Sequence, residues 1–175
     1  MAPTIIAYGG TRPRVDPTAY VAPTATLVGD VAVGPESSVW FGAVVRGDVM
    51  PITIGARTSI QDNTVIHVSE ETHPTAVGDD VTVGHSVVLH GCRVSDRVIV
   101  GIGSIVLDGA VVESDVIVGA GSLVTPGTRI PPGVLALGRP ARPARDLREE
   151  ELAWIRENAR LYVGYRERYR AGDSA

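Results

Sequence analysis

The chain has 175 residues and a formal net charge of −4, with 16 basic and 20 acidic residues scattered along it. This length is enough for one domain with its own core, and the absence of a basic stripe argues against a nucleic-acid partner. No apolar run approaches the ~18 residues of a membrane span. The single cysteine, Cys92, excludes an internal disulfide, and the segment from Met1 to Thr4 does not begin a signal peptide, so we expect a cytoplasmic location.

An aliphatic residue returns every six positions through most of the chain. The last run is unbroken and consists of Val94, Val100, Val106, Val112, Val118, Val124 and Ile130. Earlier runs, in shifted frames, consist of Val15, Val21, Leu27, Val33, Val39, Val45, then Ile54, Ile60, Ile66, then Val77, Val83 and Leu89. Helix faces recur at 3.6 residues and alternating strands at two, so a period of six is typical of a parallel β-helix.

In such a fold three hexapeptides make one triangular coil, and each aliphatic residue points inward onto its equivalent one coil away, at about 4.8 Å. The repeats from Val15 to Ile130 predict roughly six coils. A β-sandwich is the alternative fold, but its turns come at irregular intervals of roughly 8–12 residues. The repeat therefore predicts an all-β solenoid.

The period slips in three places between Val45 and Val94. Three extra residues precede Ile54, five extra residues precede Val77, and one residue is missing beside Gly91. Insertions in solenoids become surface loops, often at the functional face, so we expect these slips to border the site.

After Pro143 the pattern becomes helical. We divide the chain into a β-helix domain at 1–143 and a C-terminal amphipathic helix at 144–172, with Asp146 as the expected N-cap. The apolar face of this helix consists of Leu152, Ile155, Ala159, Tyr162, Tyr165 and Tyr169. Such a face needs a partner surface, and we expect the helix to pack on the side of the β-helix.

The histidines are His67, His73, His85 and His90, all at or near the slips. His67 and His90 each follow an inward residue, and these residues are three repeats apart, so both side chains should point outward about 5 Å apart. Two such imidazoles can bind one ion at about 2.1 Å. His85 belongs to the neighbouring face, so a second copy of the chain would have to supply it. His73 is not expected to be a ligand, and solvated surface histidines are the alternative reading.

Four segments carry a family resemblance: Arg46-Gly47-Asp48, Ile60-Gln61-Asp62-Asn63, His67, and Gly84-His85 through Leu89-His90-Gly91-Cys92. With these motifs the chain resembles the γ-class carbonic anhydrases, in particular their short bacterial subgroup, over nearly its whole length. The resemblance implies a left-handed parallel β-helix that forms a homotrimer, with metal sites between the subunits. It implies that zinc, or alternatively iron(II) or cobalt, is bound by His67, His85 and His90.

The same resemblance implies roles for five further residues. Arg46 and Asp62 resemble a pair that bridges subunits, and Asp48 supports them. Gln61 resembles the amide that orients the reacting water, and Tyr162 resembles a helix tyrosine that reaches toward the site. The chain departs from the family pattern at Val49, which stands where a proton-relay glutamate is found, and in the short acidic loop around Glu70 and Glu71. We therefore expect slow proton export.

These features predict a carbonate dehydratase-type lyase that hydrates carbon dioxide to bicarbonate. One alternative is a hexapeptide-repeat acyltransferase or thioesterase that acts on a coenzyme A ester, and a bound metal would distinguish the two classes. Another is a non-enzymatic protein that binds a small ligand, which normal metal content without hydration activity would favour.

Overall fold

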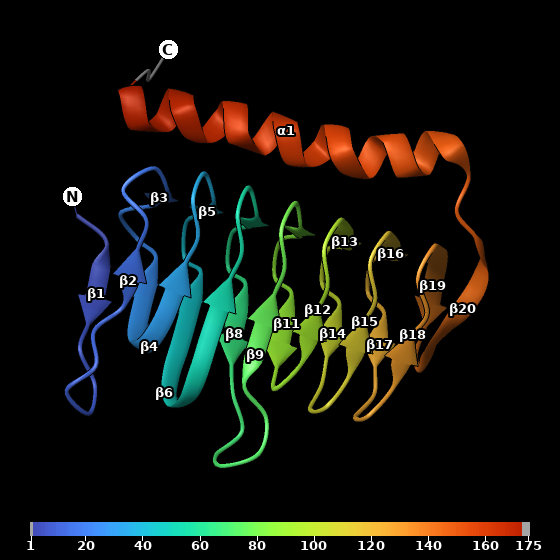
Figure 1. Cartoon of the computed structure of the whole chain (residues 1–175), viewed down its shortest axis with the longest axis horizontal. Helices are drawn as coiled ribbons and strands as arrows, with labels where there is room; N and C mark the ends of the chain where they lie inside the picture. Colours follow the sequence, from blue (N-terminus) through green and yellow to red (C-terminus); the bar gives the residue numbers. More distant parts are fainter. Residues whose placement is uncertain (1, 173–175) are drawn as a thin grey trace.

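The computed structural model describes residues 2–172; Met1, the first residue of the expected β-helix domain, and residues 173–175 lie outside the described part. The chain forms a left-handed parallel β-helix of about seven turns with one helix along its side, as predicted (Figure 1). The solenoid exceeds the predicted six coils because β1 (Thr4–Ile6) and β19 (Val134–Gly138) extend it at both ends.

The strands of the solenoid belong to two sheets. The larger sheet holds twelve strands, which are β1, β2 (Arg14–Val15), β4 (Thr26–Val33), β6 (Val44–Ile54), β8 (Val65–His67), β9 (Thr75–Val77), β11 (Val88–His90), β12 (Arg93–Val94), β14 (Ile105–Val106), β15 (Val111–Val112), β17 (Leu123–Val124) and β18 (Arg129–Ile130). The smaller sheet holds eight, which are β3 (Tyr20–Val21), β5 (Ser38–Val39), β7 (Ser59–Ile60), β10 (Thr82–Val83), β13 (Val98–Val100), β16 (Val116–Val118), β19 and β20 (Ala141–Asp146).

These strands form the three faces of the coil. The long strand β6 pairs with both β8 and β9, so the larger sheet bends around a corner and covers two faces. We call the face of β8, β11, β14 and β17 the histidine face, and the eight-stranded sheet the helix face. On the histidine face Val45, Ile66, Leu89 and Val106 are in register and have no exposed surface. The predicted inward stack is confirmed.

The two insertions behave differently. The five-residue insertion forms a loop at residues 68–74 between β8 and β9, closed by an antiparallel bridge between Ser69 and His73 (Figure 1). The three-residue insertion stays within β6 instead of leaving as a loop. Because β6 pairs with β4 on both sides of the insertion, its backbone stays extended and the extra residues appear as a register shift opposite Asp30.

The helix α1 (Glu149–Ala171) contacts β3, β5 and β10, so it packs on the helix face as predicted (Figure 1). Its N-cap is Arg148 rather than Asp146. Asp146 pairs with Val134 at the end of β20, which continues the sheet as an antiparallel strand and delays the helix. Glu151 accepts a hydrogen bond from the Arg148 amide at 2.9 Å, as in a capping box. No helix within residues 2–172 is long and apolar enough to cross a membrane.

The buried face of α1 differs in part from the predicted one. Ile155 and Ala159 are buried, but Tyr165 and Tyr169 are 41% and 52% exposed. Arg166 is buried instead, and its guanidinium donates a hydrogen bond to the Thr18 carbonyl. The ring of Tyr169 still contacts Tyr20, Trp40 and Phe41, at centroid distances of 5.7, 5.0 and 5.8 Å. A polar anchor therefore joins the predicted apolar contact near the end of the helix.

Candidate metal centre

His67 and His90 end two neighbouring strands of the histidine face. They are paired in register, as predicted, because one coil separates β8 from β11. His67 Nδ1 lies 3.1 Å from His90 Nε2, and the two rings meet edge to face. The side chains are 19% and 32% exposed, so both rings are accessible from the solvent side of the face.

A carboxylate holds the other nitrogen of each ring. Asp48 Oδ1 lies 3.0 Å from His67 Nε2, and Asp108 Oδ1 lies 2.6 Å from His90 Nδ1. Partial burial acts to raise the pKa of Asp48, but hydrogen bonds from His67 and Arg46 outweigh it and the pKa lies below its usual value. The hydrogen bond from His90 lowers the pKa of Asp108, against a smaller opposing effect of burial. Both carboxylates are therefore ionised acceptors at neutral pH.

This arrangement determines the tautomers of the two rings. An ionised carboxylate can only accept, so in a neutral ring the proton of His67 lies on Nε2 and that of His90 lies on Nδ1. The facing nitrogens, His67 Nδ1 and His90 Nε2, then both present lone pairs across 3.1 Å. Two lone pairs repel each other at this distance, so the gap suits a shared proton or a shared cation.

His85 lies at a corner of the coil, just after β10, with Gln61, Asp62 and Tyr162 nearby. Its Nδ1 is 2.8 Å from Asp62 Oδ2, and its side chain is 45% exposed. Gln61 is buried and hydrogen-bonds Tyr162 of α1. Burial, with a smaller contribution from the charge of Asp62, raises the pKa of Tyr162, so its phenol stays neutral.

The predicted site residues thus fall into two half-sites. The first consists of Arg46, Asp48, His67 and His90 on the histidine face. The second consists of Gln61, Asp62, His85 and Tyr162 beneath α1. Within residues 2–172 of one chain, no three His, Cys, Asp or Glu side chains lie together in a group that could hold a metal ion.

Arg46 and Asp62, the predicted pair between subunits, belong to different half-sites. Within one chain Arg46 forms an ion pair with Asp48 and keeps 46% of its side chain exposed. Asp62 bonds His85. The exposed part of Arg46 is therefore free to contact another molecule, while its ion pair orients the carboxylate of Asp48.

The structure adds two residues that the sequence analysis did not identify. Asp108 bonds His90, and Ser69 donates a hydrogen bond to Asp108 Oδ2 at 2.8 Å. Asp108 follows His90 by 18 residues, which is one coil of three hexapeptides, so the periodicity could have placed it beside the histidine. Ser69 belongs to the loop 68–74, whose path the repeat does not predict.

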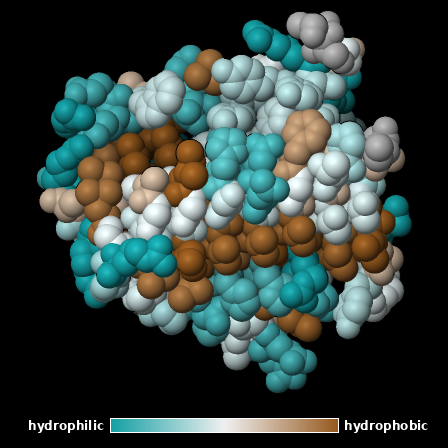
Figure 2. All heavy atoms as spheres, turned by 180° about the vertical axis from the view of Figure 1, so that it is seen from behind, coloured by the Kyte–Doolittle hydropathy of each residue, from teal (hydrophilic) through white to brown (hydrophobic). Residues whose placement is uncertain are grey.

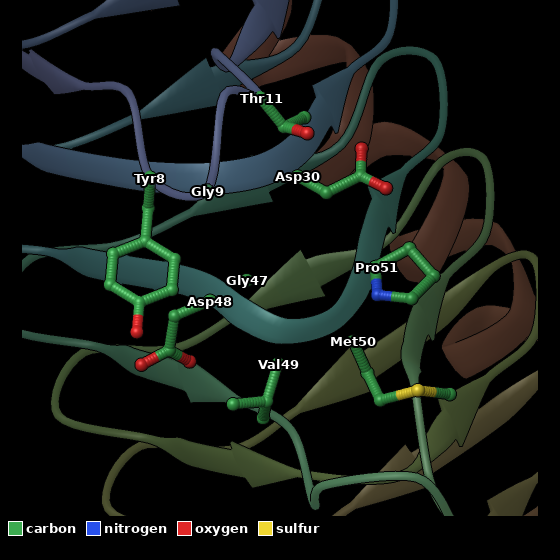
Figure 3. Close-up of a pocket in the computed structure, with 9 residues that line it drawn as sticks. All are labelled: Tyr8, Gly9, Thr11, Asp30, Gly47, Asp48, Val49, Met50 and Pro51. Atoms are coloured by element: carbon green, nitrogen blue, oxygen red, sulfur yellow. The ribbon is translucent and has the colours of Figure 1, made fainter.

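A hollow of about 240 Å³ borders the first half-site. It lies between the turn at Tyr8–Thr11 and the extra residues of β6, and Figure 3 shows the Tyr8 phenol above the Asp48 carboxylate. Val49 and Met50 form the opposite rim (Figure 3). Val49 therefore supplies an apolar wall next to Asp48, where the family resemblance implied an acid. A second hollow, of about 310 Å³, lies beside Asp62 and Tyr162 under α1.

An apolar band runs along the histidine face (Figure 2). Its members are outward-facing residues in register on successive strands, namely Val44, Val65, Val88, Ile105 and Leu123. Val65 is 40% exposed, and Ile102, one coil from His85, is 57% exposed. Large apolar surfaces of this kind mark contact sites for other molecules.

No family model matches the chain. Curated proteins do match it over most of its length. It is 57% identical over 143 residues to the probable carbonic anhydrase of Methanocaldococcus jannaschii, covering 82% of this chain and 89% of that protein. It is 44% identical over 167 residues to the carbonic anhydrase of Geobacillus kaustophilus, covering 95% and 91%.

The chain is also 47% identical over 155 residues to the mitochondrial γ carbonic anhydrase 1 of Arabidopsis thaliana. This match covers 86% of the chain and only 56% of the plant protein. Among solved structures, a hexapeptide transferase family protein from Anaplasma phagocytophilum matches with 42% identity and a TM-score of 0.92. The match covers 97% of this chain and 99% of that one.

A second solved structure, a putative acetyltransferase from Bacillus cereus, also has 42% identity, with a TM-score of 0.94. The match covers 96% of this chain and 97% of that one. The names of these relatives thus divide between carbonic anhydrase and transferase. The chemistry must therefore be argued from the two half-sites.

Proposed function

Because the chain belongs to the γ-class carbonic anhydrase family, we propose that it is a metal-dependent carbonate dehydratase that hydrates carbon dioxide to bicarbonate. The observation that carries the proposal is the pair of facing nitrogens of His67 and His90, each with a carboxylate on its other ring nitrogen. Metal-bound histidines in proteins have this arrangement of an outer carboxylate.

The distance between the two nitrogens fits a shared zinc ion. Two ligands at about 2.1 Å in tetrahedral geometry lie about 3.4 Å apart, close to the observed 3.1 Å. His85 has the same design, because Asp62 holds its Nδ1 and leaves Nε2 as the free ligand atom. Three neutral imidazoles suit zinc, and they also suit iron(II) or cobalt. Zinc remains our first choice.

A bound zinc ion would supply a Lewis acid that lowers the pKa of water to about 7. The surrounding residues then have separate tasks. Asp48 and Asp62 hold the rings of His67 and His85 and keep their protons away from the ligand atoms. The buried amide of Gln61, held by Tyr162, would orient the reacting water or carbon dioxide. The neutral phenol of Tyr162 can donate a hydrogen bond to an oxygen of the substrate.

We propose a homotrimer in which each site combines the first half-site of one subunit with His85 of the next. The separation of the two half-sites supports this assembly, because neither can bind zinc with three histidines alone. The apolar band of the histidine face and the exposed Ile102 beside His85 offer the surfaces to be buried. Closed rotational symmetry would give every subunit both contacts. We also propose a cytoplasmic location, which the single buried cysteine supports.

Acyl transfer is the competing function, because the similar structure from Bacillus cereus is a putative acetyltransferase. An acyltransferase needs one histidine as a base, which does not account for three histidines that each have a carboxylate on the nitrogen away from the site. The metal hypothesis accounts for all three. Metal content and hydration activity therefore distinguish the two functions.

The test is metal analysis of anaerobically purified protein, with a carbon dioxide hydration assay on the same sample. We expect about one zinc-type ion per chain and hydration that a chelator abolishes. His85→Ala and His90→Ala should each lose most of the metal. A metal-free protein that hydrolyses or transfers acyl groups would refute the proposal, and full metal content without hydration at any pH would indicate a binding role.

A further inference from the structure

The loop 68–74 packs against the strands that carry the first half-site. Two backbone hydrogen bonds join Ser69 and His73 and close the loop, at 3.1 Å and 3.3 Å. The Thr75 hydroxyl beyond the loop donates to the His67 carbonyl at 2.6 Å. The loop is therefore tied at its base to the end of β8, directly beneath a proposed ligand.

Two glycines make room for this packing. A Cβ atom on Gly91 would lie 2.3 Å from Asp108 Oδ1 and 2.8 Å from His73 Cβ. A Cβ atom on Gly109 would lie 3.1 Å from His73 Nε2. The absence of side chains at both positions thus admits the Asp108 carboxylate and the His73 ring. Gly91 stands at the one-residue deletion in the repeat, so this slip and the inserted loop serve the same local structure.

The Asp108 carboxylate uses its two oxygens for two different partners. Oδ1 accepts from His90 Nδ1 at 2.6 Å, and Oδ2 accepts from Ser69 Oγ at 2.8 Å. With both oxygens engaged, the carboxylate cannot rotate without losing a hydrogen bond. The position of the loop is thereby connected, through one side chain, to the orientation of the His90 ring.

Equivalent aspartates elsewhere in the solenoid make different contacts. Asp96 also lies over a glycine, with its Oδ1 2.3 Å from a Cβ built on Gly78. It accepts from the backbone amide of Asp79 at 2.9 Å, which stabilises a turn. Asp108 has the same packing over Gly91 but directs its oxygen to an imidazole, so its bond is not explained by the fold alone.

We propose that Ser69 and Asp108 form a positioning pair that fixes the ring orientation and tautomer of His90, so that the inserted loop helps to set the metal affinity of the site. The part on affinity rests on the proposed function, whereas the part on the tautomer concerns the metal-free chain. Asp48 and Asp62, which hold the other two rings, lie outside this loop. The loop therefore acts on one ligand of the three.

The test compares Asp108→Ala and Ser69→Ala with the matched control Asp96→Ala in the full-length protein. Long-range ¹⁵N NMR of the metal-free protein reports the tautomer of His90, and competition with a chromophoric chelator reports zinc affinity. We expect Nδ1–H in the parent and loss of this preference in Asp108→Ala. Zinc affinity should fall about 10–100-fold, as is usual when an outer partner is removed, with a smaller fall in Ser69→Ala.

Asp96→Ala should keep the His90 tautomer and bind zinc with an affinity within about twofold of the parent, even if it lowers the stability. An unchanged tautomer in Asp108→Ala, or an equal loss of zinc in Asp96→Ala, would overturn the positioning pair. If Asp108→Ala does not fold, Ser69→Ala makes the comparison instead, because it keeps the packing of Asp108 over Gly91. A parent that binds no zinc would refute the proposed function, and the tautomer measurement would still decide the role of Asp108.

Discussion

Two defective chains should restore a metal site when they assemble together. A His85→Ala chain keeps the first half-site intact, and a His90→Ala chain keeps the second. A homotrimer of either variant lacks a complete site at every interface. In a mixed trimer, however, the intact half-site of one chain can face the intact half-site of the other, provided that the sites lie between subunits.

The expected recovery follows from the number of half-sites. Each interface needs an intact His67 and His90 from one chain and an intact His85 from the next. With equal amounts of the two variants and random assembly, each requirement is met half of the time. About a quarter of all interfaces should then be complete, so metal content should recover to about a quarter of the parent value. The recovered sites contain all three histidines and should match the parent in affinity.

The assay is co-expression of the two variants and metal analysis of the whole trimer population; mixed trimers isolated through different tags should each hold one complete interface of three, or about a third of the parent metal. The control mixes His67→Ala with His90→Ala, whose defects lie in the same half-site, so no interface can be complete. Failure of His85→Ala and His90→Ala to recover any metal would refute the interfacial site. Recovery in the control mixture would show that a different set of ligands binds the metal.

Ile102→Asp should weaken the trimer about tenfold in sedimentation at increasing dilution, because burying the 57% of Ile102 that is exposed in one chain contributes about 1–2 kcal/mol at each interface. Burial raises the pKa of Cys92 to about 12, so the neutral thiol should not react with a thiol reagent at about pH 8 until the protein unfolds. The hydrogen bond from Arg97 lowers the pKa of Asp115 in the folded protein. The ionised Asp115 carboxylate therefore stabilises the fold at a pH above its ordinary pKa, and this stabilisation is lost as the pH falls through the pKa of the folded state. Asp115→Asn should therefore lose less stability than the parent as the pH falls below about 4 in urea unfolding. Because Val49 offers no proton acceptor, hydration should be slow in dilute buffer and rise with imidazole concentration; a fast, buffer-independent rate would contradict this.

Periodicity predicted the parts of this structure that depend on the backbone. The register of His67 with His90 follows from counting hexapeptides, because stacked strands have one fixed spacing. The paths of inserted residues do not follow from the count. The extra residues of β6 stayed extended because β4 pairs with the strand on both sides, and the loop 68–74 folded back to place Ser69 against Asp108. Both outcomes depend on contacts that a one-dimensional repeat does not contain.

The start of α1 and its buried face also depend on tertiary contacts that the sequence pattern does not contain. An N-cap at Asp146 agreed with local helix signals, but pairing of β20 with β19 competed for the same residues and prevailed. The helical spacing of tyrosines predicted an apolar contact, which Tyr169 makes with Trp40 and Phe41. The spacing did not predict the buried Arg166, which bonds the Thr18 carbonyl. Local propensity therefore identified the element, and tertiary hydrogen bonds decided its boundary and its orientation.

The shape of the solenoid explains why a three-histidine site should require a second subunit. Inward residues such as Ile66 and Leu89 build the core, which leaves the next position on each strand free to carry chemistry. Stacking brings two such positions on one face within reach of a single ion. Side chains on adjacent faces of a convex prism diverge, so His85 cannot join His67 and His90 from the same chain. A neighbouring copy can present its corner to that face, and the apolar band beside the histidines would then be buried by the contact that completes the site.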